Sequence, residues 1–309
     1  CSAHAATTAV KPEGPAAGPA GAPTTASPTA EGMRFGSVRF PVSCSPAAQE
    51  QFDLAVAQLH SFFYPETVKS FTRVLEIDPT CAMAYWGIAR SQPPNPLVPP
   101  FPPGTYQRGR EAVARGRALG APTQRERDWL DAAGAYFADP DEAPYSLRIG
   151  KYARAMERLA RSHPDDTEAQ VFYTLALLES ADAHDLAFDK QFKAARILEA
   201  QQSAHPGHPG ITHYLIHAYD YSPIAGKGLD AANDYARIAP SAPHALHMPS
   251  HIYSMLGMWK PSIQSNQATL AASRTQVISR RSSGRSRSSG AVCEPRLASS
   301  RASGSRAEG

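Results

Sequence analysis

The sequence predicts an all-α fold in which pairs of antiparallel helices stack into a superhelix. Apolar residues recur at helical spacing, short proline-containing segments separate the helical stretches, and several residues return after 34 positions. A period of this length is typical of arrays whose unit is a helix–turn–helix pair. The separators are HPDD, HPGHPG and APSAP at 163–166, 205–210 and 239–243.

The repeat is clearest in the histidines. His213 and His217 are followed by His247 and His251, and both intervals, 247 − 213 and 251 − 217, are 34 residues. Two adjacent units therefore carry the same pair of imidazoles in equivalent places. The residues that return at the same offset are Pro206, Pro209 and Tyr219, as Pro240, Pro243 and Tyr253.

The first helix pair is predicted over 47–78. Phe52, Val56 and Leu59 lie on one helical face, a second apolar face follows over 65–78, and Pro79 ends the second helix. Five more pairs are predicted by the same spacing and separators. They cover 81–119, 123–162, 166–203, 209–238 and 243–272.

The pattern F-x-x-V-L-E-I-D-P followed by A-x-A-Y-W-G-I-A resembles the tetratricopeptide consensus, which Phe71, Pro79 and Tyr85 fit. The resemblance extends over 47–272, although residues such as Gln201 stand where the family has a small side chain. It implies a superhelix whose concave groove, formed by the first helix of each pair, binds a protein or peptide partner.

Both ends of the chain are expected to be disordered. Residues 1–32 are mostly Ala, Pro, Gly and Thr, as in a flexible tether, and 273–309 are rich in Ser, Arg and Gly. The helical repeat domain is therefore assigned to 33–272. The tail holds eight Arg and two Glu, so it contributes +6, and the rest of the chain sums to 3 − 6 = −3. No aromatic residue interleaves this basic tract, which argues against a nucleic-acid partner; a solvated tail or a translated frameshift are its other interpretations.

The chain begins at Cys1, followed by a polar tether, which resembles a mature bacterial lipoprotein acylated at its N-terminal cysteine. This implies export to the cell envelope or periplasm with a lipid on Cys1 as the membrane attachment, and a truncated gene model is the alternative. Cys44 and Cys81 precede the first helices of two successive pairs. In a stacked array, such helices start next to each other. The two cysteines are within disulfide reach, and buried free thiols are the other possibility.

A proline-dense insertion, QPPNPLVPPFPPG at 92–104, interrupts the second helix pair. Proline lacks an N–H and restricts its predecessor, so the segment must be extended. Leu97, Val98 and Phe101 would be apolar groups on a solvated loop. This favours a lid packed on the array over a free connection.

The histidines are the candidate metal ligands. His213 and His217 are four residues apart and share a helical face, and the next helix lies about 8–10 Å away, so imidazoles from two helices could converge. Three or four imidazoles suit Zn or Cu, and Asp220 or a water could complete the shell. Pro249 is expected to delay a helix start and leave His247 on the entering loop. The family's groove positions fall on His213, His217, Asp220, His244, His247 and His251.

Two other interpretations of the histidines remain open: a polar groove for peptides or small anions, and structural histidines copied when the units duplicated. The sequence contains no G-x-S-x-G, H-E-x-x-H, P-loop, C-x-x-C or dinucleotide glycine motif. It therefore favours a binding or scaffold protein of the cell envelope over an enzyme. The enzymatic alternative is a metal-dependent hydrolase in which Asp220 or Asp185 acts as base on a metal-bound water.

Overall fold

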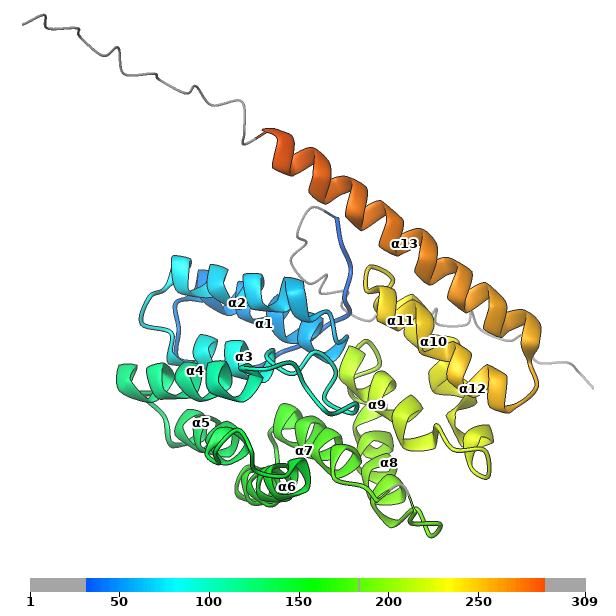
Figure 1. Cartoon of the computed structure of the whole chain (residues 1–309), viewed down its shortest axis with the longest axis horizontal. Helices are drawn as coiled ribbons and strands as arrows, with labels where there is room; N and C mark the ends of the chain where they lie inside the picture. Colours follow the sequence, from blue (N-terminus) through cyan, green and yellow to red (C-terminus); the bar gives the residue numbers. More distant parts are fainter. Residues whose placement is uncertain (1–31, 183, 287–309) are drawn as a thin grey trace, which may run out of the picture.

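The computed structural model describes residues 32–182 and 184–286, and this part of the chain is all-α with no strand (Figure 1). Consecutive helices pack as antiparallel pairs, and each predicted pair has a counterpart, so the predicted fold class is confirmed. The helices are α1 (Pro46–His60), α2 (Tyr64–Ile77), α3 (Ala82–Arg90), α4 (Thr105–Leu119), α5 (Gln124–Phe137), α6 (Tyr145–Ser162), α7 (Thr167–Glu179), α8 (Asp189–Gln202), α9 (Pro209–Tyr219), the 3-10 helix η1 (Ala225–Gly228), α10 (Leu229–Ile238), α11 (Pro243–His247), α12 (Pro249–Met255) and α13 (Trp259–Ser286).

The separators seen in the sequence end one helix and begin the next. Proline occupies the first turn of α9 and of α11, where its missing N–H has no helical partner to lose. At α5, Thr123 and Glu126 form a reciprocal capping box. Asp166 caps α7 by accepting from the Ala169 amide, and His208 caps α9 by accepting from the Ile211 amide. Polar residues at the starts of α5, α7 and α9 thus each satisfy a free amide of the first turn.

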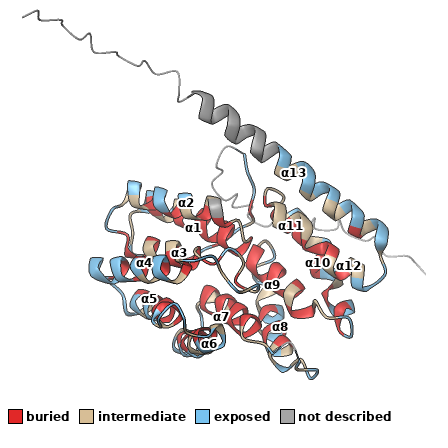
Figure 2. Ribbon diagram, in the orientation of Figure 1, coloured by how far each residue is buried: buried red, intermediate tan, exposed pale blue. Residues whose placement is uncertain are grey.

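The first helices of the array are mostly buried, and α1 packs against α9. The first helices α1, α3, α7 and α9 are mostly buried, whereas the described part of α13 is mostly exposed (Figure 2). Helix α1 contacts α9 directly: His60 hydrogen-bonds Tyr214 at 3.0 Å. Aromatic and imidazole side chains therefore lie between these helices at this end of the array.

An extended segment at 33–44, for which the sequence predicted no element, holds the helix starts together. The Ser37 amide donates to the Gly207 carbonyl just before α9, and the Ser43 amide donates to Glu126 in the first turn of α5. Phe40 is fully buried against Trp86 and Trp129, with ring centroids 5.1 and 4.8 Å away. This strap belongs to the core of the domain.

Cys44 at the end of this strap is joined to Cys81 by a disulfide, with the two Cα atoms 5.1 Å apart. Cys81 is the N-cap residue of α3 and is buried. The sequence left disulfide and free thiols open, and the structure has the disulfide. The bond ties the strap to the second helix pair.

The insertion at 92–104 packs against the domain. Tyr145 of α6 donates to the Pro96 carbonyl at 2.9 Å, and the Phe101 ring lies 5.9 Å from the Tyr145 ring. Leu97 and Phe101 are half-buried, while Val98 is exposed. The apolar groups other than Val98 are thus partly shielded from solvent, as expected for a segment packed on the array.

Two boundaries differ from the sequence expectations. Met248 keeps a helical backbone between α11 and α12, so His247 ends a helix, and the expectation that it lies on an entering loop is wrong. Pro249 occupies the first position of α12, where the helix needs no N–H. Helix α13 continues past residue 272 to Ser286, into the segment assigned to the tail. Cys1 and residues 287–309 lie outside the described residues.

No helix in the described part of the chain is both long enough and apolar enough to cross a bilayer.

Candidate metal centre

Three of the predicted ligands converge on one point between α9 and α11. The Nε2 atom of His213 lies 3.0 Å from Nε2 of His217 and 3.1 Å from Nε2 of His244. His213 and His217 share a face of α9 because they are four residues apart, and His244 enters from the first turn of α11. Their ligand atoms all lie within 4.8 Å of one another.

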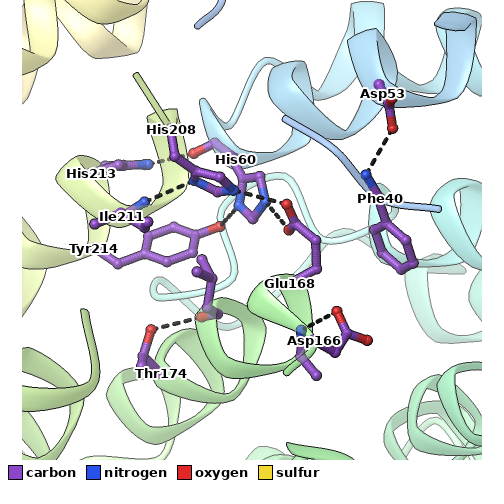
Figure 3. A network of polar contacts seen from close by, with 12 residues as sticks. Phe40, Asp53, His60, Asp166, Glu168, Thr174, His208, Ile211, His213 and Tyr214 are labelled. Atoms are coloured by element: carbon purple, nitrogen blue, oxygen red, sulfur yellow. Dashed lines mark hydrogen bonds and ion pairs between the residues drawn. The ribbon is translucent and has the colours of Figure 1, made fainter. Parts of the chain in front are cut away.

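The hydrogen bond on the far side of His213 fixes its tautomer. Nδ1 lies 2.6 Å from the main-chain carbonyl oxygen of His60, which can only accept, so Nδ1 carries the hydrogen (Figure 3). Nε2 of His213 therefore presents a single lone pair toward two other imidazoles. One lone pair accepts one good hydrogen bond, so hydrogen bonding satisfies only one of the two contacts. A metal ion at the common point would satisfy all three nitrogens.

Burial keeps the three rings neutral at pH 7. It lowers the pKa of His213 well below its ordinary value, assisted by His217 and His244. Burial and the neighbouring His244 lower the pKa of His217 in the same direction. Burial, followed by the effects of His247 and His251, lowers the pKa of His244 to about 3. Neutral imidazole is the form that binds metal, so these rings need lose no proton to do so.

Aromatic rings cover the three histidines. The Phe62 ring stacks on His217 and His244 with centroids 5.8 and 5.3 Å away, and the Tyr235 ring stacks on His213 at 5.0 Å. Phe62 adopts a left-handed backbone with φ of 51°, which is unusual for an aromatic residue. Such strain persists where the surrounding packing fixes it. The apolar cover limits solvent access and strengthens polar interactions beneath it.

The other three predicted ligands form a separate group. Nε2 of His247 lies 3.0 Å from Nε2 of His251, and Nδ1 of His251 lies 2.7 Å from Oδ2 of Asp220. Asp220 therefore contacts the outer nitrogen of His251 and does not join the three converging Nε2 atoms. The six predicted residues are neighbours, but they divide into one group of three imidazoles and one group of two imidazoles with a carboxylate.

A second histidine cluster was missed by the sequence analysis. His60, Glu168 and His208 lie together in the core, and all three are buried. Nε2 of His60 and Nε2 of His208 each lie 2.8 Å from a different oxygen of Glu168 (Figure 3). These residues come from α1, the first turn of α7 and the N-cap of α9. No period links them, and only the fold brings them together.

This buried cluster is complete without an ion. His208 Nδ1 accepts from the Ile211 amide and His60 Nδ1 pairs with the Tyr214 hydroxyl, so each Nε2–H can donate to Glu168. Burial opposes ionisation of Glu168, but His208 and His60 outweigh it and hold the pKa of its carboxyl well below the usual range. Burial lowers the pKa of His60 against the effect of Glu168. The cluster is thus a buried, ionised carboxylate held between two imidazoles that both hydrogen-bond to it.

Glycine permits this close packing. A Cβ atom on Gly210, in the first turn of α9, would lie 2.4 Å from Nδ1 of His60. His60 can therefore lie directly against the start of α9, where its side chain reaches Glu168 and its carbonyl reaches His213. The buried cluster supports the candidate metal centre by fixing the residue that orients His213.

No family model matches the chain, and no curated protein matches it. Among solved structures, the crystal structure of YrrB, described as a TPR protein with an unusual peptide-binding site, is similar to this chain at 16% sequence identity. The similarity covers 65% of this chain and 90% of that one, with a TM-score of 0.33. The stacked antiparallel pairs and their proline-containing separators, both present in the described residues, give this chain a tetratricopeptide-like helical repeat fold.

Proposed function

We propose that this protein is a metal-binding helical repeat protein in which His213, His217 and His244 hold one Zn²⁺ or Cu²⁺ ion. The observation that carries the proposal is the convergence of three Nε2 atoms. That of His213 lies 3.0 Å from that of His217 and 3.1 Å from that of His244. Two nitrogens bound to one tetrahedral Zn²⁺ at 2.0–2.1 Å are about 3.3 Å apart, so a small outward movement would admit the ion. A water or a partner's side chain would complete the coordination.

The donor set and its surroundings favour these metals. Three neutral imidazoles match the nitrogen preference of Zn²⁺ and Cu²⁺, whereas Mg²⁺ and Ca²⁺ prefer oxygen ligands. The Nδ1–H of His213 donates to the His60 carbonyl, which is the outer hydrogen bond that metal-binding histidines commonly make. The arrangement is therefore prepared for a metal before any ion binds.

The test is a calorimetric titration of untagged, metal-free protein with Zn²⁺ and with Cu²⁺. The double variant His213→Asn/His217→Asn is expected to weaken the tightest binding event by on the order of 100-fold or more, because two of three ligands are lost. Far-ultraviolet circular dichroism checks that helicity is retained, and His244→Asn, at a partly exposed position, provides a second variant.

The matched control is His163→Asn/His205→Asn. It removes two imidazoles that pair with Asp128 and Thr167 away from the centre and should leave the binding unchanged. Equal affinity of the wild-type protein and the His213/His217 variant, with both folded, would refute the proposal.

The hydrolase alternative has no support in the described residues. Asp220 is hydrogen-bonded to His251, and Asp185 accepts from the Ala187 and Asp189 amides in the turn before α8. Neither carboxylate lies among the ligand atoms of the three-histidine centre.

A peptide or protein partner is part of the proposal, and a cavity of about 710 Å³ between α6 and α8 is the surface that favours it. Its floor includes Ile149 and Leu177, and its rim includes Lys190 and Lys193. Peptides selected for binding from a random library should lose affinity for a Leu177→Arg variant, because the arginine would fill the apolar floor. Selected peptides that bind this variant as well as the wild type would place the partner elsewhere.

We propose an oxidising compartment outside the cytoplasm for this protein, in the cell envelope or periplasm. The Cys44–Cys81 disulfide supports the proposal, since disulfides persist in oxidising environments. Alkylation of unreduced protein from its native cells, read by mass spectrometry, tests it: two free thiols at these positions would count against export.

A further inference from the structure

We propose that His247 and His251 form a second metal-binding centre beside the first, so that the array holds two ions. The inference rests on the proposed function and deepens it. It separates the predicted ligands into an inner centre, composed of His213, His217 and His244, and an outer centre, composed of His247 and His251.

The Nδ1 atoms of His247 and His251 each lie within hydrogen-bond distance of an oxygen that accepts. Nδ1 of His251 lies 2.7 Å from a carboxylate oxygen of Asp220, and Nδ1 of His247 lies 2.7 Å from Oδ1 of Asn266. The Asn266 amide is oriented by its own Nδ2, which donates to the Ser262 carbonyl at 3.0 Å. Both histidines therefore carry their hydrogen on Nδ1.

It follows that the two Nε2 lone pairs face each other at 3.0 Å. Two lone pairs at this distance repel unless a cation lies between them. A metal ion at this place would be bound by both lone pairs at once. Histidines that donate Nδ1–H to a carboxylate or carbonyl oxygen and expose Nε2 have the arrangement of metal ligands with their outer hydrogen bonds in place.

The inner centre has the same construction one repeat earlier. His213 and His217 are also four residues apart with their Nε2 atoms at 3.0 Å, and His213 also donates Nδ1–H to an oxygen. Each of the two units thus carries a pair of ligands, and in each pair the first histidine is oriented by a hydrogen bond from its Nδ1. In both pairs the hydrogen bond at Nδ1 leaves an Nε2 lone pair directed at the neighbouring ring, as a metal site requires.

The two centres are adjacent but differ in exposure. The rings of His244 and His247, one from each centre, have centroids 6.1 Å apart. His213 of the inner centre is fully buried, whereas the His251 side chain is 34% exposed. With only two protein ligands, an outer ion keeps positions for water or for a side chain of a bound partner. The inner centre is therefore the tighter site and the outer centre the exchangeable one.

Asp220 acts on the outer ion through His251. Its Oδ2 holds the His251 ring, so Asp220 is a positioning residue here and not a ligand. Asp220→Ala should lower the occupancy of the outer centre while the inner ion stays bound, a difference that a general loss of stability would not produce.

The experiment is equilibrium dialysis of untagged protein against a fixed excess of free Zn²⁺, followed by elemental analysis. The wild type should retain two ions per chain, His247→Asn/His251→Asn one, and His213→Asn/His217→Asn one. With Cu²⁺, electron paramagnetic resonance should show dipolar coupling between two ions in the wild type and none in either variant. The control His163→Asn/His205→Asn should retain two ions, and circular dichroism reports folding for every variant.

Each result bears on a different claim. One ion in the wild type that survives in the His247/His251 variant overturns the second centre and leaves the proposed function standing. One ion that is lost in both double variants also overturns it, because a single ion would then be shared. No ion in the wild type refutes the proposed function itself. Because the outer residues are partly exposed, single variants at His247 and His251 extend the test if a double variant fails to fold.

Discussion

Replacing Glu168 by alanine is expected to destabilise the protein by about 3–5 kcal/mol, as is typical when one partner of a buried charged cluster is removed. The Glu168 carboxylate accepts from His60 and His208 at 2.8 Å, and all three side chains are buried. Without it, two imidazole N–H groups are left in the core with no acceptor. The free energy of unfolding in urea measures the effect.

The matched control is Glu157→Ala. Glu157 is about 41% exposed and pairs with Lys193, so its removal should cost less than about 1 kcal/mol. If Glu168→Ala lowered the free energy of unfolding as little as the control does, the claim that the buried cluster stabilises the fold would be contradicted.

Glu168 also predicts a dependence of stability on pH. Its pKa is lower in the folded chain than its ordinary value of 4.5, so its contribution is present above that value and is lost as the pH falls toward the folded pKa. The wild type should therefore lose stability below pH 4.5 more steeply than Glu168→Gln, which cannot ionise. Parallel curves for the two proteins in acid would show that Glu168 is not held ionised by its histidines.

Removing the disulfide is expected to lower stability by about 3–4 kcal/mol, the loss estimated from unfolded-chain entropy for a loop of this size. Cys44 and Cys81 are separated by 37 residues, and their bond anchors the strap at 33–44 whose Phe40 is fully buried. Cys44→Ala/Cys81→Ala should have a lower urea midpoint than the oxidised wild type. Reductant should shift the wild type toward this value and leave the variant unchanged. An unchanged wild-type midpoint in reductant would mean that the bond contributes nothing.

The helices could be predicted from the sequence because their signals are local. Spaced apolar residues such as Phe52 and Val56, and prolines such as Pro209 at a helix start, act within one or two turns. The 34-residue interval then placed His213 and His217 in register with His247 and His251. In the structure both pairs have Nε2 atoms 3.0 Å apart, because equivalent positions on neighbouring units keep equivalent geometry.

The rest depends on contacts between distant parts of the chain. His60 meets Glu168 across 108 positions, and His213 reaches the His60 carbonyl across 153. Neither pair has a sequence signal, since each joins the end of α1 to a distant helix, α7 at Glu168 and α9 at His213. The contact between α1 and α9 also brings Phe62 over the histidines. Asp220 was assigned as a ligand by its place in the consensus, and only the orientation of the His251 ring shows that it binds the outer nitrogen.

The central claim is that three imidazoles of α9 and α11 form one nitrogen-ligated metal centre. X-ray absorption spectroscopy of the untagged His247→Asn/His251→Asn variant, loaded with one equivalent of Zn²⁺, tests it most directly. The account predicts three imidazole nitrogens at about 2.0 Å with the outer-ring scattering that histidine produces, together with one light ligand. A first shell composed of oxygen alone, with no imidazole scattering, would contradict it.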